Sequence, residues 1–159
     1  MGAPLHALLS DYLWKKLSAR NDAVIAVDAS RVPYVGAGMN ACARDLARFG
    51  MMMIGMGTLE GEEIVPKTWI EDTIKGSVNS RPQYAKGQYG DVMLDRHYRN
   101  QMWMMPETEG ALLAIGIHGQ VINMNPLGFK TYHATELPHI IHLAHYRYRK
   151  LPTYFSEEP

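Results

Sequence analysis

Two stretches in the first half of the chain place apolar residues at the three- and four-residue spacing of an amphipathic helix. The first covers residues 5–17, where the apolar positions are Leu5, Leu8, Leu9, Tyr12, Leu13 and Leu17. The second begins at Asn40, a residue type that caps helix N-termini, and runs to about Met53, with Gly55 or Gly57 suited to end it. Its charged side chains are expected on the solvated face: Arg44, Asp45 and Arg48.

Glycine and proline divide the remainder of this half into shorter elements. The predicted elements are a strand over 22–28, a loop over 30–38, a hairpin over 59–65, a helix over 67–74 and a long surface loop over 75–91. Gly61 suits the turn of the hairpin. Pro66 suits the first position of the helix, where a missing N–H costs no hydrogen bond.

The second half of the chain changes to short apolar runs separated by turn residues, which is typical of strands. Four strands are predicted, over residues 98–105, 111–117, 120–125 and 129–133. Residues 107–110 supply a first turn, Gly119 a tight junction between the second and third strands, and residues 136–149 a closing helix. Consecutive strands after a helical half indicate an α/β protein of the layered α+β kind, with an antiparallel sheet packed against helices.

Composition removes several classes of function. Lysine plus arginine and aspartate plus glutamate both number 16, so no basic field points to nucleic acid or to an anionic membrane. No apolar run reaches 18 residues, and residues 1–10 lack the pattern of a secretory signal. The cytoplasm is therefore the default expectation, although the compartment stays open. A single cysteine excludes an intramolecular disulfide framework.

Five segments, in order, resemble the C-terminal part of penicillin-recognising, β-lactamase-like serine hydrolases, near class C β-lactamases, related esterases and 6-aminohexanoate-oligomer hydrolases. They are residues 12–23 (YLWKKL…NDA), 36–50 (GAGMNACARDLARFG), 61–70 (G…IVP..WI), 98–103 (YRNQMW) and 116–126 (GIHGQ…NP). The resemblance implies a partial β-lactamase/transpeptidase-like fold over residues 1–128. Residues 129–159 depart from the family pattern and form a divergent tail, with a last strand and a helix as its expected elements.

In this family a serine in a Ser-x-x-Lys turn attacks an ester or amide carbonyl and forms an acyl-enzyme. None of the six serines here has a lysine three residues later, and Lys130-Thr131 is not followed by glycine. The expectation is a fragment whose N-terminal half, with nucleophile and base, is missing. The Tyr98-Arg99-Asn100 match to the family's Tyr-x-Asn loop is interpreted as accidental, because it falls in the segment that resembles a different motif.

The resemblance also implies a site at residues 116–120. By position, the backbone amide of Ile117 would contribute to the oxyanion hole, which stabilises the charge that develops on the substrate carbonyl oxygen. The residues flanking the substrate would be Gly116, His118, Gly119 and Gln120. For His118 two interpretations stay open, because its imidazole could contact substrate or could satisfy a neighbouring backbone group.

Other candidates for chemistry are weaker. Cys42 is interpreted as a buried, inert thiol. The histidines His133, His139, His142 and His145 are too awkwardly spaced for a tight metal site, and neither metal nor cofactor is expected. The expected partners are a small ester or amide substrate and the missing N-terminal half, with self-association through exposed apolar surface. The alternative to half an enzyme is a non-catalytic remnant or interaction module on the same scaffold.

Overall fold

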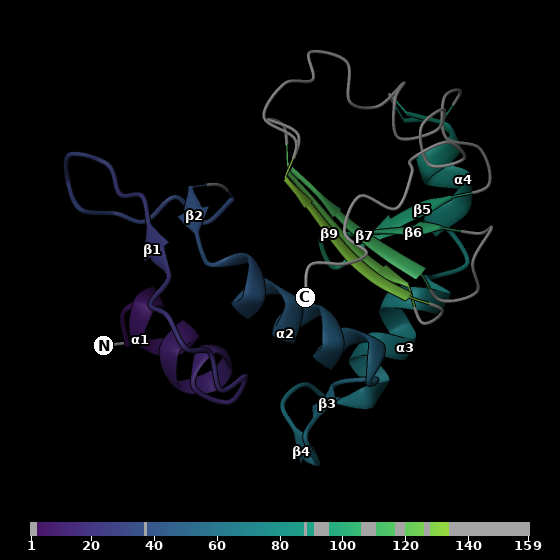
Figure 1. Ribbon diagram of the computed structural model, residues 1–159. Coiled ribbons are helices and arrows are strands. Elements are labelled where there is room, and N and C mark those ends of the chain that lie inside the picture. The colour runs from purple at the N-terminus through teal and green to yellow at the C-terminus, as the bar shows by residue number, and fades with distance from the viewer. Residues whose placement is uncertain are drawn as a thin grey trace.

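The computed structural model of the chain describes residues 3–36, 38–87, 89–90, 96–105, 111–116, 120–125 and, by backbone alone, 128–133. Its first half contains helices and two small hairpins, and its second half contains one sheet (Figure 1). The elements are α1 (Leu5–Leu9), η1 (Ser10–Trp14), β1 (Val24–Ile25), β2 (Met39–Asn40), α2 (Ala43–Ile54), β3 (Thr58–Leu59), β4 (Glu62–Glu63), α3 (Lys67–Lys75), α4 (Ser80–Ala85), β5 (His97–Arg99), β6 (Met102–Met105), β7 (Ala111–Ile115), β8 (Gln120–Asn125) and β9 (Gly128–His133).

The sheet has five antiparallel strands in sequential order, β5-β6-β7-β8-β9, so β7 is the central strand. Leu113 of β7 pairs with Trp103 of β6 on one side and with Asn123 of β8 on the other. The α2 helix lies against β8 and β9. The predicted antiparallel meander packed against helices is confirmed, and with it the layered α+β class.

One predicted strand is in fact a hairpin. Residues 98–105 were expected to run straight, but the chain reverses at Asn100 and Gln101, whose φ angles are 50° and 64°. Two consecutive residues with positive φ form the tight turn that matches the twist of antiparallel strands. The prediction was wrong because Asn-Gln lacks the glycine that usually marks such a turn.

The main core lies between the sheet and the helices. It consists of Leu17, Met52, Met53, Leu59, Ile70, Met102, Met104, Leu112 and Met124, all nearly inaccessible to solvent. More than half of these residues are methionines, whose flexible side chains fill irregular gaps. A second, smaller cluster of Met105, Ala111 and Leu113 lies on a separate apolar patch of the sheet.

The helices begin and end differently from the sequence expectation. The predicted helix over 5–17 forms α1 and then changes to π geometry in η1, where the N–H of Lys15 bonds the carbonyl of Ser10. Cys42, not Asn40, precedes the first turn of α2, because Asn40 pairs with Val24 in a two-stranded sheet. Gly55 ends α2 as predicted.

The segment from Thr58 to Ala85 contains one confirmed and two corrected predictions. The hairpin β3–β4 turns at Glu60 and Gly61, both at positive φ, as the position of Gly61 predicted. Pro66 caps α3 from outside instead of occupying its first position. The expected surface loop over 75–91 contains the short helix α4. None of the helices in the described residues is long and apolar enough to cross a membrane.

Candidate functional site

Gly116 and Gln120, the two ends of the predicted site, lie side by side at the junction between β7 and β8. The N–H of Gly116 donates to the carbonyl of Gln120 at 2.8 Å, directly beyond the Ile115–Val121 pair. Three residues of the sequence separate Gly116 from Gln120: Ile117, His118 and Gly119. These three lie outside the described residues, so the oxyanion amide at Ile117 and the role of His118 stay predictions.

The side chain of Gln120 lies over Gly116 at the end of β7. A Cβ atom built on Gly116 would lie 2.4 Å from Oε1 of Gln120, so the carboxamide rests directly over the glycine. Gln120 is exposed and Gly116 is half-buried. An exposed carboxamide can donate and accept hydrogen bonds, which suits contact with an amide substrate.

The junction follows a strand that is buried over most of its length. Ala111, Leu112 and Leu113 of β7 are almost fully buried, with Leu112 in the main core and Leu113 in the smaller cluster. Exposure increases only at the end of the strand, where Ala114 and Ile115 are half-buried. A site on a strand that packs on both sides is held more firmly than a site on a free loop.

Asp45 anchors the start of α2, contrary to the prediction that it is solvated. Its buried carboxylate accepts hydrogen bonds from the backbone N–H groups of Arg20 and Asn21, at 2.9 and 3.1 Å, and from the Asn21 side chain at 2.9 Å. The Arg20 N–H, then the Asn21 side chain, hold the pKa of Asp45 below its usual range. No local pattern could predict this, because the partners are 24 and 25 residues away.

Arg48, one turn later, is also partly buried and not fully solvated. Its guanidinium donates to the carbonyl of Leu17 and forms an ion pair with Glu60 at 2.9 Å. Arg44 is exposed, as predicted. Together with Asp45, Arg48 ties α2 to the chain that follows η1, and so connects the N-terminal segment to the helix behind the sheet.

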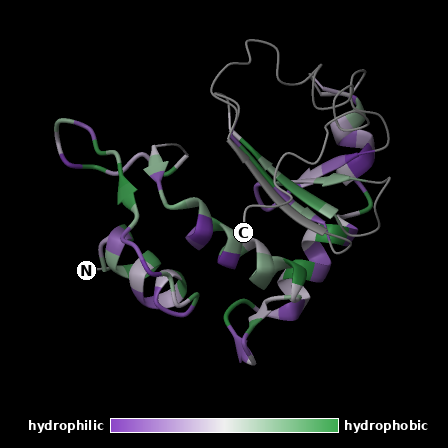
Figure 2. Cartoon of the chain, viewed as in Figure 1, coloured by the Kyte–Doolittle hydropathy of each residue, from purple (hydrophilic) through white to green (hydrophobic). Residues whose placement is uncertain are grey.

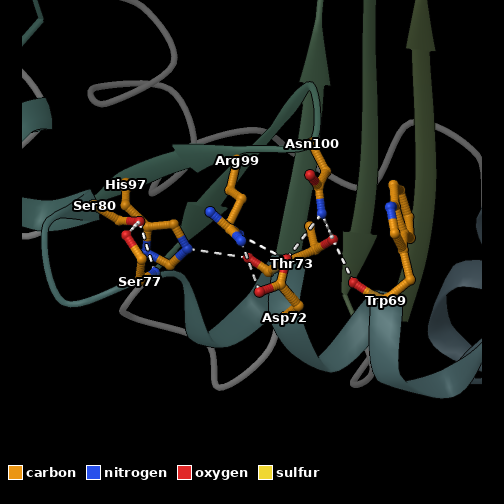
Figure 3. Close-up of polar contacts among 8 residues, drawn as sticks. All are labelled: Trp69, Asp72, Thr73, Ser77, Ser80, His97, Arg99 and Asn100. Atoms are coloured by element: carbon orange, nitrogen blue, oxygen red, sulfur yellow. Dashed lines mark hydrogen bonds and ion pairs between the residues drawn. The ribbon is translucent and has the colours of Figure 1, made fainter.

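A polar network joins α3 to the β5–β6 turn (Figure 3). Arg99 holds the Asp72 carboxylate through two hydrogen bonds of 2.6 and 2.8 Å, which lowers the pKa of Asp72 and raises that of Arg99. Asn100 donates to Asp72 at 3.3 Å and to the hydroxyl of Thr73 at 2.8 Å. The Tyr98-Arg99-Asn100 motif is therefore occupied in holding a hairpin turn on a helix.

His97 is the most buried titratable group beside this network. Its Nε2 lies 3.0 Å from the carbonyl of Thr73, and its Nδ1 has no hydrogen-bond partner (Figure 3). Its ring packs against Gly76, where an added Cβ would approach Nε2 within 3.0 Å. A buried histidine with one backbone partner fits a structural role in holding β5 to α3.

A shallow hollow of about 340 Å³ opens beside the same network. It is lined by Ser77, Asn79, Ser80, Gln83, Tyr84 and Tyr98, and neither Gly116 nor Gln120, the predicted site residues that the structure describes, is among them. Burial raises the pKa of Tyr84, which packs edge-on against Trp103. Ser77 and Ser80 share a hydroxyl–hydroxyl contact of 3.0 Å. Among the described residues, no basic side chain bonds either hydroxyl, so this part of the chain does not supply an activated nucleophile to the hollow.

Two further predictions have different outcomes. Cys42 is exposed, so the expectation of a buried thiol is wrong; it lies just before the first turn of α2, on the outer side of the chain. The side chains of His133, His139, His142 and His145 lie outside the described residues. Within the described part of the chain, no three histidine, cysteine, aspartate or glutamate side chains gather in a possible metal-binding group.

Comparison with known proteins gives two informative relatives. The chain is 36% identical over 118 residues to a 6-aminohexanoate-dimer hydrolase of Paenarthrobacter ureafaciens, which covers 74% of this chain and 30% of that protein. A solved structure from Bacillus anthracis, whose 6-aminohexanoate-dimer hydrolase name is provisional, matches with a TM-score of 0.62 and 30% identity. It covers 74% of this chain and 29% of that chain. No family model matches.

The relatives agree with the motifs and with the fold. The chain spans less than a third of the length of each relative, so the match concerns one portion of a larger hydrolase. Within that portion, sequence identity and the antiparallel sheet packed on helices point to the same group. Over the matched residues, this chain is similar to proteins named 6-aminohexanoate-dimer hydrolase, which is consistent with the predicted resemblance to β-lactamase-like serine hydrolases.

Proposed function

We propose that this chain forms the substrate-side edge of a hydrolase that cleaves amide bonds through an acyl-enzyme. The observation that carries the proposal is the 118-residue match to a protein named 6-aminohexanoate-dimer hydrolase. The β7–β8 junction supports it, since Gly116 and Gln120 meet at the end of the buried central strand. Linear amides are therefore the first substrate class to test, ahead of β-lactams and short esters.

The chain's own contribution is to bind and polarise the carbonyl group. The amide of Ile117 would donate to the carbonyl oxygen as it becomes negatively charged, and one such donor contributes about 3–4 kcal/mol to transition-state stabilisation. Gln120 would hold the substrate amide beside it, with His118 and Gly119 completing the wall of the site. Rigid packing of β7 keeps these donors oriented before the reaction.

The attacking serine and its base would come from a segment with a Ser-x-x-Lys turn. The 159 residues contain no such sequence. A hydroxyl is a poor nucleophile without a base within hydrogen-bond reach, and among the described residues Ser77 and Ser80 bond each other and a backbone N–H but no base. The 159-residue chain by itself should therefore hydrolyse no amide through a serine.

The test combines a covalent probe with a substrate assay. The purified chain is treated with a fluorophosphonate, and mass spectrometry is used to find any adduct and to identify the residue that carries it. The same chain is then co-expressed with the unmatched portion of the Paenarthrobacter protein and assayed on the 6-aminohexanoate dimer. We expect no adduct on the chain alone, and labelling of the supplied serine with hydrolysis in the combined preparation. A Ser→Ala change in the supplied Ser-x-x-Lys turn is the control.

Two results would contradict the proposal. Stoichiometric labelling of any of the six serines would mean that the chain carries its own nucleophile. A stable combined preparation that is labelled on its supplied serine but hydrolyses neither amides, esters nor β-lactams would favour the second candidate, a non-catalytic module. The absence of Ser-x-x-Lys from these 159 residues is what favours that candidate.

A further inference from the structure

The segment of residues 24–40, which we call the lobe, is ordered by its own backbone (Figure 1). β1 and β2 pair through Val24–Asn40 and Ile25–Met39. Additional hydrogen bonds join Ala26 to the carbonyl of Gly38 and Tyr34 to that of Ala26, at 2.9 and 3.0 Å. The Asp28 carboxylate closes the tip by accepting from two backbone N–H groups. The lobe therefore holds its shape without an apolar core of its own.

The apolar side chains of the lobe face solvent. Six large hydrophobic residues are 44% to 83% exposed: Val24, Val27, Val32, Tyr34, Val35 and Met39. They are half of all the exposed large hydrophobic residues in the described part of the chain, although the lobe makes up only about a seventh of the described residues. Figure 2 shows this hydrophobic colour on β1 and on parts of the loop toward β2. A two-stranded ribbon is marginally stable alone, and this concentration of exposed apolar side chains on one ribbon is typical of a segment that another polypeptide covers.

The exposed apolar side chains and zero net charge of the lobe favour an apolar protein surface as its partner. Its charged residues are Asp28 and Arg31, which cancel, so nothing in the lobe attracts a phosphate backbone or an anionic membrane. Among the described elements, β1 and β2 contact each other and make no extensive contact with α2 or the five-stranded sheet. The apolar side chains thus have no cover within the described residues.

The comparison with known proteins suggests which polypeptide could cover the apolar side chains of the lobe. The matched residues make up 30% of the Paenarthrobacter protein, so 70% of that hydrolase has no counterpart in the match. We infer that the lobe is the docking surface for this unmatched, nucleophile-bearing portion of the hydrolase. The inference rests on the proposed function for the identity of its partner, and adds the surface through which the two portions assemble.

The experiment measures assembly separately from catalysis. The full chain carries an affinity tag and is co-expressed with the unmatched portion of the Paenarthrobacter protein, and the co-purified amount is measured. The test variant is the double substitution V27K and V35K in the lobe. The matched control is V78K, because Val78 is 93% exposed and lies between α3 and α4. Circular dichroism melting checks that each variant folds as the wild-type chain does.

We expect the wild type and V78K to retain the supplied portion equally. The lobe variant should lose it on the order of tenfold or more, since two buried valines are replaced by charges at the contact. Equal retention by all three proteins would overturn the inference, even if the combined preparation hydrolyses amide. Retention without hydrolysis would contradict the proposed function and leave the docking surface intact.

A second copy of the chain is the competing occupant. Sedimentation of the purified chain distinguishes it. If the wild type forms a dimer that V27K and V35K abolish, and the supplied portion does not compete for that surface, the lobe is a homodimer contact and the inference is wrong.

Discussion

Replacing Gly57 with alanine tests how closely the backbone after α2 approaches the backbone at Val65. Gly57 has a φ of +92°, and a Cβ atom there would lie 2.0 Å from the carbonyl oxygen of Val65. Its own carbonyl accepts the N–H groups of Ile64 and Val65 at 2.9 and 3.1 Å, which draws the two segments together. Alanine would therefore be strained at its φ angle and would also push away the segment Ile64–Val65, whose N–H groups bond the carbonyl of Gly57.

The magnitude follows from these two terms. The left-handed conformation costs a non-glycine residue roughly 1–2 kcal/mol. Relieving the contact requires a movement of about 1 Å, since a carbon and an oxygen atom ordinarily approach to about 3.3 Å. That movement weakens both hydrogen bonds to Gly57, each of which stabilises the fold by about 1 kcal/mol. The Gly57→Ala variant should lose about 3–4 kcal/mol of unfolding free energy.

Gly61 provides a matched control in the same hairpin region. Its φ is +87°, but no atom lies within 4 Å of the position that a Cβ would occupy. Gly61→Ala should therefore show the conformational cost alone, roughly 1–2 kcal/mol. Replacing glycine with alanine also restricts the unfolded chain and so stabilises the folded state, but this stabilisation is common to both variants and cancels when they are compared.

The assay is thermal unfolding followed by circular dichroism, on both variants at one protein concentration. A difference of about 2 kcal/mol corresponds to a melting temperature about 4–8 °C lower for Gly57→Ala than for Gly61→Ala. Equal melting temperatures for the two variants would refute the reasoning, because they would show that Val65 does not crowd Gly57.

Three further predictions follow from the buried residues. The pKa values of Asp45 and Asp72 are lowered in the folded protein, so their stabilisation is present above the unfolded value and is lost as pH falls below about 4. Asp45→Asn should be less stable at pH 7 and should depend less on pH in acid, as measured by urea unfolding at a series of pH values. Leu112→Ala should lose about 3 kcal/mol by opening a cavity in the main core, whereas Val78→Ala should change stability by less than about 0.5 kcal/mol in the same assay. Asn100→Ala should be about 1 kcal/mol less stable than Asn100→Gly. Both variants lose the hydrogen bonds to Asp72 and Thr73, but only glycine adopts a φ of 50° without strain. Similar melting temperatures for the two variants would argue against the turn geometry.

Several features of this protein were decided by local sequence alone. The alternation of turn residues and apolar runs predicted β8 at its observed bounds and predicted the antiparallel meander to which β7 and β8 belong. Gly61 indicated the β3–β4 turn, and Gly55 the end of α2. These predictions succeeded because a turn glycine or an apolar run acts on its own neighbours, within the span that one element covers.

Other features were decided only when distant segments met. The sequence pattern places Asp45 on the solvated face of a helix, yet it is buried, because two backbone N–H groups of Arg20 and Asn21 and the Asn21 side chain donate to its carboxylate. Asn100 and Gln101 form a turn without glycine, because Asp72 and Thr73 of α3 hold the Asn100 side chain in place. The motif at 116–120 predicted a site, and only the pairing of Gly116 with Gln120 places the two ends of this segment beside each other, between β7 and β8. Hydrogen bonds between residues far apart in the chain depend on the packed fold, and residue spacing along the sequence does not encode them.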